Sequence, residues 1–469
     1  YISPAGNDAN KGDDSGSPKK SFSQYFGSGQ TTWGTANGNT QARPVLQPGD
    51  TLILKDSATY NATTTGLPNI YCVGTPENAR NGTASLPITI TAETERAARI
   101  TGNGAGYAFL IHDCSYYIIV GLDIRNVDDE TKGANQGAVF EALRSKHLTI
   151  RRNILSHANR ICRAGSFTGD TDGCNVHTLV VDQSSDSLVE ENEVFDYRRH
   201  GISITGGSTG IEVRRNFIAR RTDSTEDWCD KGANWGKHCT ADAGCAAKAC
   251  ETGSHAACTT SATCGGSACT AGTCITRSGD GSPIDFYPAA DSRMENNIAW
   301  GTGGRFQVIG VHIAVCNASA GAPAGVRCSV DADCGTGQCT GEIATSGNLV
   351  TGNVGIDLGD WDNDGTYEVN GYGVAVSAHP SSYGAIPYDN ISRENLLISP
   401  AQNGDYHRTT VNTIVDGDTI FNWGAKVSSA GMYVDEDSAV VCGSWTINYP
   451  SAPSPVRRCS ITVGNALLL

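Results

Sequence analysis

A short phrase recurs along this chain, made of an apolar residue, two polar residues, an asparagine and another apolar residue. Four clear copies and two looser ones occupy residues 150–154, 213–217, 294–298 and 350–354 and the surroundings of Asn192 and Asn395. Recurrence of one strand-and-turn phrase is typical of a solenoid, because a single repeat cannot bury its apolar face and must stack on the next. The phrase therefore constrains the fold before any catalytic motif is considered.

Each copy adjoins a short apolar or β-branched run, such as His147–Ile150 or Gly201–Ile204, that is closed by glycine or asparagine. These runs predict strands and an all-β protein, because 56 glycines and many small polar residues interrupt every helical pattern except a short one at Ala138–Leu143. We expect each asparagine to adopt the left-handed conformation of a sharp corner. Its amide is expected to bond the same amide one rung away, at a strand spacing of about 4.8 Å.

Composition and charge indicate the environment and the partners. The 18 cysteines, without a metal-finger pattern, indicate an oxidising compartment and hence secretion. A chain that starts at Tyr1 without an initiator methionine or signal sequence is typical of a processed mature protein. No run approaches the roughly 18 apolar residues of a membrane-spanning helix. The net charge of −15 disfavours nucleic acid and anionic membranes as partners.

The arginine doublets allow two interpretations. Arg151–Arg152 and Arg214–Arg215 occupy the place in the phrase that Glu190–Glu191 occupies between them. Stacking of these three copies predicts an Arg/Glu/Arg ladder on one face of the solenoid. The alternative is a basic groove for an acidic ligand, lined by these doublets together with Arg198–Arg199 and Arg220–Arg221, and the sequence leaves it open.

The N-terminal region and several later runs resemble a known superfamily. Tyr1–Gly12 is followed by Gln47–Leu52, and Ser115–Leu122 has the pattern of a rung. These stretches resemble secreted right-handed parallel β-helix proteins of the pectate-lyase-like superfamily, over roughly residues 1 to 400. The resemblance implies a right-handed parallel β-helix, a scaffold that carries lyases, hydrolases, adhesins and phage fibres, so function must be argued from a site.

One part of the resemblance concerns lyase chemistry. Residues 278–287 are similar to the aspartate-rich rung of a calcium-using pectate lyase group, which implies Asp280 and Asp285 as catalytic candidates. Lyases of this superfamily remove a proton next to a uronate carboxylate that calcium or a cationic side chain neutralises. The aspartates are fewer here and that group's basic lysine has no counterpart, so Arg293 or Arg305 is the candidate base.

A second part concerns hydrolases. Arg199–Ile204 is similar to a phrase of polygalacturonases, which implies His200 as a catalytic candidate. Inverting glycosidases hold two carboxylates about 6.5–9.5 Å apart around a water, and the paired aspartates of the polygalacturonases are absent from this sequence. The alternative for His200 is a histidine at a solvated corner. A glycoside hydrolase is therefore less favoured than a lyase.

The cysteines of two insertions follow one spacing, with five residues between the first and second and four between the second and third. Three copies predict a small disulfide module used three times, formed by Cys239, Cys245 and Cys250, by Cys258, Cys264 and Cys269, and by Cys328, Cys334 and Cys339. The last copy resembles short cysteine repeats of secreted bacterial proteins. These spacings do not fit a zinc cluster and no Cys-x-x-Cys-His occurs, so neither zinc nor haem is expected, and the pairing stays open.

These features divide one solenoid domain into five segments. They are an N-terminal cap with the first rungs (1–228), a cysteine-rich insertion (229–276), further rungs (277–315), a second cysteine-rich insertion (316–342), and final rungs with a C-terminal cap or assembly strand (343–469).

The segment between residues 360 and 368 alternates oxygen-bearing side chains before a turn glycine. This spacing predicts a Ca²⁺ loop whose ligands are Asp360, Asp362, Asp364, Thr366 and Glu368. The loop resembles calcium-binding repeats, although Gly371 stands where their final glutamate would stand. The alternative is an Asp/Asn turn without metal. We expect bound Ca²⁺ to stiffen this loop rather than to take part in catalysis.

Two functions follow from these observations. The first is a secreted structural or surface protein that associates with copies of itself, end to end, into filaments. The ends of a solenoid expose unpaired backbone, and the β-prone run at residues 460–469 is suited to pair with a neighbour. The alternative is an enzyme acting on extracellular polysaccharide, a calcium-assisted uronate lyase before a glycoside hydrolase.

Overall fold

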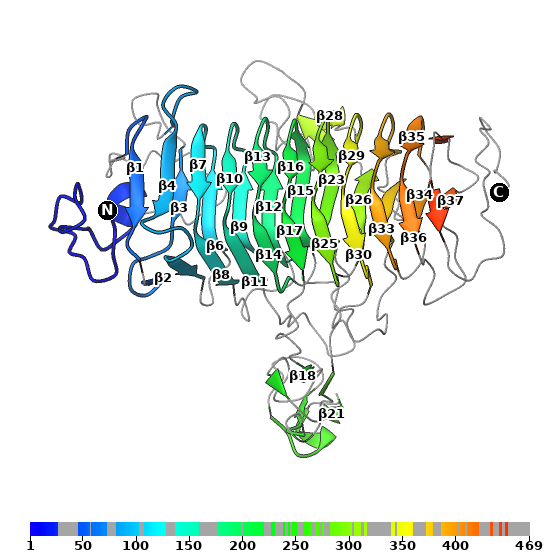
Figure 1. Ribbon diagram of the computed structural model, residues 1–469. Coiled ribbons are helices and arrows are strands. Elements are labelled where there is room, and N and C mark those ends of the chain that lie inside the picture. Colours follow the sequence, from blue (N-terminus) through cyan, green and yellow to red (C-terminus); the bar gives the residue numbers. More distant parts are fainter. Residues whose placement is uncertain are drawn as a thin grey trace.

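The chain forms a right-handed parallel β-helix, as the sequence predicts (Figure 1). The structure is a computed structural model. It describes residues 1–26, 46–56, 58–72, 81–102, 107–127, 137–158, 176–197, 200–219, 227–229, 238–239, 243, 246–250, 257–264, 268–271, 274–275, 282–302, 304–310, 314–316, 339–342, 345–359, 372–378, 386–400, 404–408, 410–421, 432–434, 440–442 and 446–448.

Three parallel sheets run along the column, and successive turns add neighbouring strands to each. The first sheet consists of β1 (Thr51–Leu54), β4 (Ile88–Ala92), β7 (Tyr117–Val120), β10 (Thr149–Arg151), β13 (Leu188–Glu190), β16 (Glu212–Arg214), β24 (Arg293–Glu295), β29 (Leu349–Thr351), β32 (Ile391–Arg393), β35 (Thr413–Asp416) and β38 (Val440–Cys442). The second consists of β2 (Thr59–Asn61), β5 (Arg99–Thr101), β8 (Asp123–Val127), β11 (Ile154–Ala158), β14 (Glu193–Phe195), β17 (Phe217–Ala219), β25 (Ile298–Trp300), β30 (Val354–Ile356), β33 (Leu396–Ile398), β36 (Thr419–Phe421) and β39 (Thr446–Asn448). The third consists of β3 (Asn69–Tyr71), β6 (Tyr107–His112), β9 (Gly137–Leu143), β12 (Val176–Asp182), β15 (His200–Thr209), β23 (Ile284–Ala290), β26 (Phe306–Gly310), β31 (Val374–Ala378), β34 (Asp405–Arg408) and β37 (Met432–Val434).

The interior of the column is filled by alternate residues of the strands. In β4 every second residue is buried, and such residues form one continuous apolar core. Side chains at the same position stack between turns, so that the rings of Phe109 and Phe140 lie 4.7 Å apart and nearly parallel. Because successive side chains of a strand point to opposite faces, the remaining residues lie on the outer face, where each sheet has its own chemistry.

The recurring asparagine forms the predicted ladder at the corner between the first and second sheets. The side-chain amide of Asn153 donates to Oδ1 of Asn192 at 3.1 Å, and Asn192 donates to Oδ1 of Asn216 at 3.0 Å. The same contact continues through Asn297, Asn353 and Asn395 and ends on Asp418.

We expected the asparagine to adopt the left-handed conformation at this corner, but the residue before it does so. Positive φ values occur at Arg152, Glu191, Arg215, Asn296, Gly352 and Glu394. The asparagine side chain must point inward, because its Oδ1 also accepts a backbone N–H of the neighbouring rung, as Asn192 does from Asn153 at 3.1 Å. The bend is therefore made by the residue on the outside of the corner.

The expected short helical piece at Ala138–Leu143 is also wrong, because these residues belong to strand β9. Pairing with β6 on one side and β12 on the other outweighs a local helical pattern. Within the described residues the α-helical structure is limited to α1 (Ser23–Phe26). No helix in this part of the chain has the length and hydropathy needed to cross a membrane.

The N-terminal segment covers the first turn of the column. Ile2 pairs with Leu54 at the outer edge of β1 and also with Lys19. Phe22 stacks with Phe26 of α1 and contacts the ring of Tyr60, and all three rings are buried. The backbone edge and the apolar interior of the first turn are therefore both closed by the chain itself.

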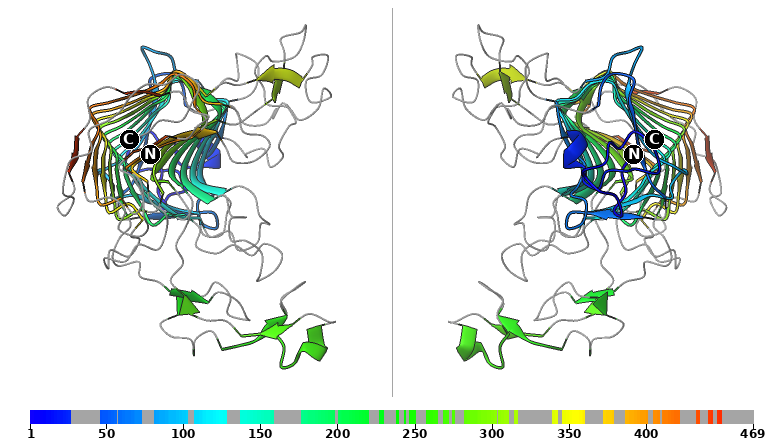
Figure 2. Two further views of the ribbon diagram at one scale, coloured as in Figure 1. Left: turned by 90° about the vertical axis from the view of Figure 1, so that its right-hand side faces the viewer. Right: turned by 90° about the vertical axis from the view of Figure 1, so that its left-hand side faces the viewer.

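Two insertions extend from the column next to the third sheet. The first lies between β17 and β23 and contains antiparallel strands β18 (Asp227–Cys229), β19 (His238–Cys239), β20 (Ala249–Cys250), β21 (Cys269–Thr270) and β22 (Cys274–Ile275) and a 3₁₀ turn, η4 (Ser261–Cys264). The second lies between β26 and β29 and contains the hairpin of β27 (Ala314–Cys316) and β28 (Cys339–Glu342). Viewed along the axis, the two insertions project at different corners of the column (Figure 2).

Two disulfides lie within the first insertion and involve the predicted cysteine repeats. Cys250 bonds to Cys264, and Cys258 bonds to Cys269. The first bridge joins two repeats and the second closes one of them. Because these four sulfurs are oxidised, they cannot act as thiolate metal ligands.

A third disulfide, Cys72–Cys114, lies in the column itself and was not among the predicted cysteines. It joins the residues that follow β3 to those that follow β6. Several predicted cysteines fall outside the described residues, namely Cys245, Cys328 and Cys334 and the side chains of Cys239 and Cys339.

Candidate functional site

The outer face of the third sheet carries a row of polar residues. Ile284 and Phe286 of β23 point into the core, so Asp285 between them lies on the outer face. The strand register aligns this position with Glu141, Val180, Ser203, Gln307, Ala375 and Tyr406 on the other turns. We name this row and its polar neighbours the polar strip, which comprises Tyr107, Glu141, His177, Asp182, His200, Ser203, Asp285, Arg305, Gln307, Tyr372 and Tyr406.

The centre of the polar strip is a cluster of two histidines and an aspartate. His177 and His200 are paired in register on β12 and β15, and their rings stack 5.0 Å apart at an angle of 21°. Nδ1 of His200 lies 3.6 Å from a carboxylate oxygen of Asp285 on the next strand. His200 and Asp285 are both buried, and the Ser203 hydroxyl donates to the second Asp285 oxygen at 3.2 Å.

Glu141 gives the strip a carboxyl group that keeps its proton near neutral pH. Burial, opposed by the hydrogen bond from Tyr107 and aided by the nearby Asp182 carboxylate, raises the pKa of Glu141 to about 7. Burial likewise raises the pKa of the Tyr107 phenol, as does the adjacent Glu141. The Tyr107 hydroxyl donates to Glu141, so the protonated Glu141 is the O–H donor that this pair brings to the outer face. Each rung between Glu141 and Asp285 adds about 4.8 Å of separation.

A cationic and aromatic group lies on the strip beyond Asp285. The Arg305 guanidinium donates from Nε to Oε1 of Gln307 at 2.8 Å and lies 5.1 Å from the centre of the Tyr372 ring. The Tyr372 ring in turn packs against Tyr406 at 4.7 Å. Gln307 pairs in register with Asp285, so the arginine stands one strand away from the histidine cluster.

The sequence candidates separate into three groups. His200 and Asp285, which come from two unrelated motifs, lie together, and Arg305 lies on the same face one strand further along. Arg293 lies on β24 of the first sheet, where it contacts Glu295 at 3.6 Å. Asp280 and the predicted calcium loop, with Asp360, Asp362, Asp364, Thr366 and Glu368, fall outside the described residues.

Sequence reasoning found His200, Asp285 and Arg305 and missed the other members of the strip, among them Glu141, His177 and Asp182. A usable signal existed for Glu141, which interrupts the apolar run from Ala138 to Leu143. An acidic residue inside a strand with two apolar neighbours has no place in a core and points outward or to a partner. His177 carried no comparable signal, because only the strand register aligns it with His200.

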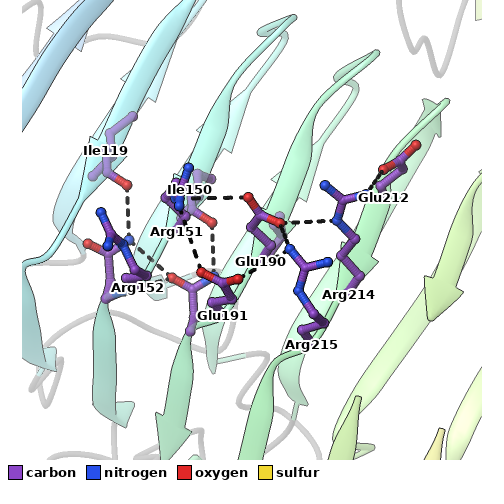
Figure 3. A network of polar contacts seen from close by, with 12 residues as sticks. Ile119, Ile150, Arg151, Arg152, Glu190, Glu191, Glu212, Arg214 and Arg215 are labelled. Carbon is purple, nitrogen blue, oxygen red and sulfur yellow. Dashed lines mark hydrogen bonds and ion pairs between the residues drawn. The ribbon is translucent and has the colours of Figure 1, made fainter. Parts of the chain in front are cut away.

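The arginine doublets belong to a different face and confirm the predicted Arg/Glu/Arg ladder (Figure 3). Glu190 stands between Arg151 and Arg214 in the first sheet and lies 3.9 Å from the former and 3.1 Å from the latter. Arg215 approaches the same carboxylate at 2.5 Å, and Arg151 also lies 3.8 Å from Glu191. These arginines are paired with glutamates, whereas the doublets Arg198–Arg199 and Arg220–Arg221 fall outside the described residues, so the basic groove stays untested there.

Comparisons with known proteins agree with the fold and do not indicate an activity. No protein family and no curated protein matches the sequence. Among solved structures, pectate lyase Pel9A is 11% identical over 97% of this chain and 78% of its own, with a TM-score of 0.43. An alginate lyase from Paenibacillus sp. str. FPU-7 is 12% identical over 86% and 93%, with a TM-score of 0.40. The tailspike protein of E. coli bacteriophage HK620, solved with a pentasaccharide, is 9% identical over 87% and 58%, with a TM-score of 0.40. At these values the likeness carries no argument about activity, which must come from the polar strip.

Proposed function

We propose that this protein binds an acidic extracellular polysaccharide along the polar strip and cleaves it by β-elimination beside a uronate carboxylate. The observation that carries the proposal is the cluster of His177, His200 and Asp285 with Arg305 one strand away on the same face. Buried titratable groups on an outer face cost folding free energy and are typical of sites that do chemistry.

The shape of the strip suits a linear polymer. Its members lie on eight successive strands of the third sheet, from β6 to β34. At about 4.8 Å per strand the strip extends roughly 34 Å along the column. A chain of several sugar units laid along the axis would therefore meet the Glu141 group, the histidine cluster and Arg305 in turn.

Arg305 is suited to hold the uronate carboxylate. Gln307 and the Tyr372 ring fix the planar guanidinium, which leaves little side-chain entropy to lose when a carboxylate binds. Neutralising that carboxylate makes the adjacent C–H proton more acidic. An imidazole of the histidine pair then accepts the proton, the new C=C bond forms, and the C–O bond to the next sugar breaks as its oxygen takes up a proton.

Calcium enters this proposal only in a supporting role. The spacing of the carboxylates between Asp360 and Glu368 favours a structural Ca²⁺ that stiffens one loop. If so, added Ca²⁺ raises the melting temperature of the protein, and Asp362→Asn removes that rise. An unchanged melting temperature of the native protein with and without Ca²⁺ contradicts it.

The test of the proposed function uses a panel of uronate polysaccharides and the ultraviolet absorbance of the unsaturated product. Arg305→Ala is expected to lower the rate about a hundredfold, because it removes the charge that neutralises the uronate carboxylate. Asp285→Asn should lower the rate by a similar factor, because the Asp285 carboxylate lies 3.6 Å from His200 and stabilises an imidazole that has taken up the proton. Arg293→Ala is the matched control, since Arg293 lies on the first sheet, and should leave the rate unchanged. Native protein that forms no unsaturated product from any uronate polymer overturns the proposal.

The second candidate is the secreted structural protein that assembles end to end. The stacked asparagine and Arg/Glu ladders favour it, since they stiffen the column along its axis. The covered edge of the first turn weighs against pairing at that end. Electron micrographs of the native protein, with and without reductant, decide between the two: uniform filaments support assembly, and single particles that cleave uronates exclude it.

A further inference from the structure

The His200 ring of the stacked histidine pair is fixed by a backbone amide. The N–H of Ser282 donates to Nδ1 of His200 at 3.1 Å. Ser282 is buried, and its own carbonyl accepts the N–H of Gly201 at 3.1 Å, so the residue is held in place by the ladder. A ring nitrogen that accepts a hydrogen bond carries no hydrogen of its own, so the neutral His200 ring has its proton on Nε2. Both nitrogens of His200 therefore have an assigned role.

The carboxylate beside His200 does not change this assignment. An Asp285 oxygen lies 3.6 Å from the same Nδ1, beyond hydrogen-bond range, whereas the Ser282 nitrogen lies within it. A second proton, placed on Nδ1, would face the Ser282 N–H in a buried place and deprive that N–H of its acceptor. His200 is therefore poorly placed to take up a proton.

The stack allows one positive charge. The rings of His177 and His200 lie 5.0 Å apart at an angle of 21°, so two charged rings would repel each other. A ring nitrogen of His177 also lies within 4.8 Å of an Asp285 oxygen, and the negative carboxylate favours a proton on His177. A neutral His200 thus permits a charged His177 in the same stack.

The other strands around His177 do not oppose that charge. Ala138 is its register partner on β9, and no lysine or arginine occurs within β9, β12, β15 or β23. The titratable groups of these four strands besides His177 are Glu141, Asp182, His200, Asp285 and Tyr287. A proton that arrives on His177 therefore has acidic or neutral neighbours on every strand of this group.

We propose that the Ser282 amide makes the pair asymmetric, so that His177 accepts the uronate proton while His200 stays neutral and positions the His177 ring. This inference rests on the proposed β-elimination for the source of the proton. In that step the electrons of the broken C–H bond form the C=C bond, and the electrons of the broken C–O bond leave with the oxygen of the departing sugar. The proton goes to His177, and solvent water supplies one to the departing oxygen.

The same substitution at both histidines tests the asymmetry. Glutamine can accept the Ser282 N–H through its carbonyl oxygen but cannot take up a proton, so it replaces His200 and not His177. His177→Gln should lower kcat on a uronate polymer about a thousandfold and remove the acidic limb of the pH profile of kcat/KM. His200→Gln should lower kcat less than about tenfold and keep that limb, because the hydrogen bond to Ser282 is retained.

His147→Asn is the matched control and should leave both quantities unchanged. His147 stacks on Tyr116 outside the cluster, and asparagine tolerates its positive φ. Circular dichroism establishes that each variant is folded before its rate is compared.

Nitrogen NMR of the histidine rings in the native full chain measures the asymmetry without substrate. The His200 ring should show an acceptor Nδ1 and a protonated Nε2, and it should stay neutral while His177 takes up its proton. A hydrogen on Nδ1 of His200, or proton uptake by His200 before His177, overturns the inference, as does an equal loss of rate in the two glutamine variants. Native protein that cleaves no uronate polymer overturns the proposed function instead, and the ring signals then still decide whether the pair is asymmetric.

Discussion

The outer faces of the first and third sheets both carry acidic side chains, but they differ in what lies opposite each carboxylate. On the first sheet the ladder places Arg151 and Arg214 on either side of Glu190. On the third sheet the ladder places Leu110 and Val180 on either side of Glu141. The two glutamates are both buried, yet one is compensated by three arginines and the other keeps its proton.

The difference shows that the neighbouring rungs of a parallel ladder decide whether a buried carboxylate is ionised and paired or keeps its proton. Because every outer residue has two neighbours about 4.8 Å away at the same position, a charge on one rung is stabilised or destabilised by the rungs beside it. Alternation of sign along the first sheet satisfies each group within the column. On the third sheet the neighbours of Glu141 at the same position are the apolar Leu110 and Val180, and this carboxyl group holds a proton instead of an arginine.

The largest expected effect concerns Glu141. Its folded pKa of about 7 lies above the ordinary value of 4.5, so the folded protein prefers the protonated form. The contribution of Glu141 to the free energy of unfolding is fully present below about pH 4.5 and is lost as the pH rises to about 7. Glu141→Gln removes the titration, and should raise the free energy of unfolding by up to about 3 kcal/mol at pH 8.5 while changing it little at pH 4.

Urea unfolding of both proteins at the two pH values measures this difference. Equal stability of Glu141→Gln and the native chain at pH 8.5 would show that Glu141 is ionised at little cost, which would remove the contrast between the two faces. A parallel loss of stability in the variant at both pH values would mean that its hydrogen bond with Tyr107 matters more than its proton.

The same substitution on the first sheet is expected to act in the opposite direction. Glu190→Gln removes the only carboxylate that Arg151, Arg214 and Arg215 approach together among the described residues. The free energy of unfolding should fall by about 2 kcal/mol at neutral pH, since a buried charge-assisted network is broken from one side. High salt should reduce the loss. An unchanged free energy of unfolding in low salt would show that the Arg/Glu/Arg ladder contributes nothing measurable to stability.

The fold was predictable from the sequence because its signal repeats. Asn153, Asn192 and their counterparts stand at equivalent places in every copy of the phrase, so each copy supports the others. The alternation of Arg151, Glu190 and Arg214 was readable for the same reason. The corner geometry was misassigned by one residue, since the sequence does not tell whether the asparagine or its exposed predecessor makes the bend.

The site was only half predictable, because its members come from positions that do not repeat. His200 and Asp285 were each suggested by a different resemblance, and nothing in the sequence indicated that they touch. They lie together because β15 pairs with β23 in one particular register. The cysteine-rich insertion separates these strands in the sequence, and sequence spacing across it does not give the register. The same holds for His177, because its pairing with His200 follows from the strand register and no sequence motif indicates it.

The smallest expected effect tests whether the two faces are independent. Arg293 is 57% exposed on the first sheet and approaches Glu295 at 3.6 Å, so Arg293→Ala should lower the free energy of unfolding by only about 0.3 kcal/mol. Its effect on uronate cleavage should be nil, in contrast to Arg305→Ala. Melting curves and rates of the two variants, measured side by side, give the comparison. If Arg293→Ala were to abolish cleavage as Arg305→Ala does, the charge on the first sheet would be reaching the substrate, and the division between a structural and a reactive face would have to be abandoned.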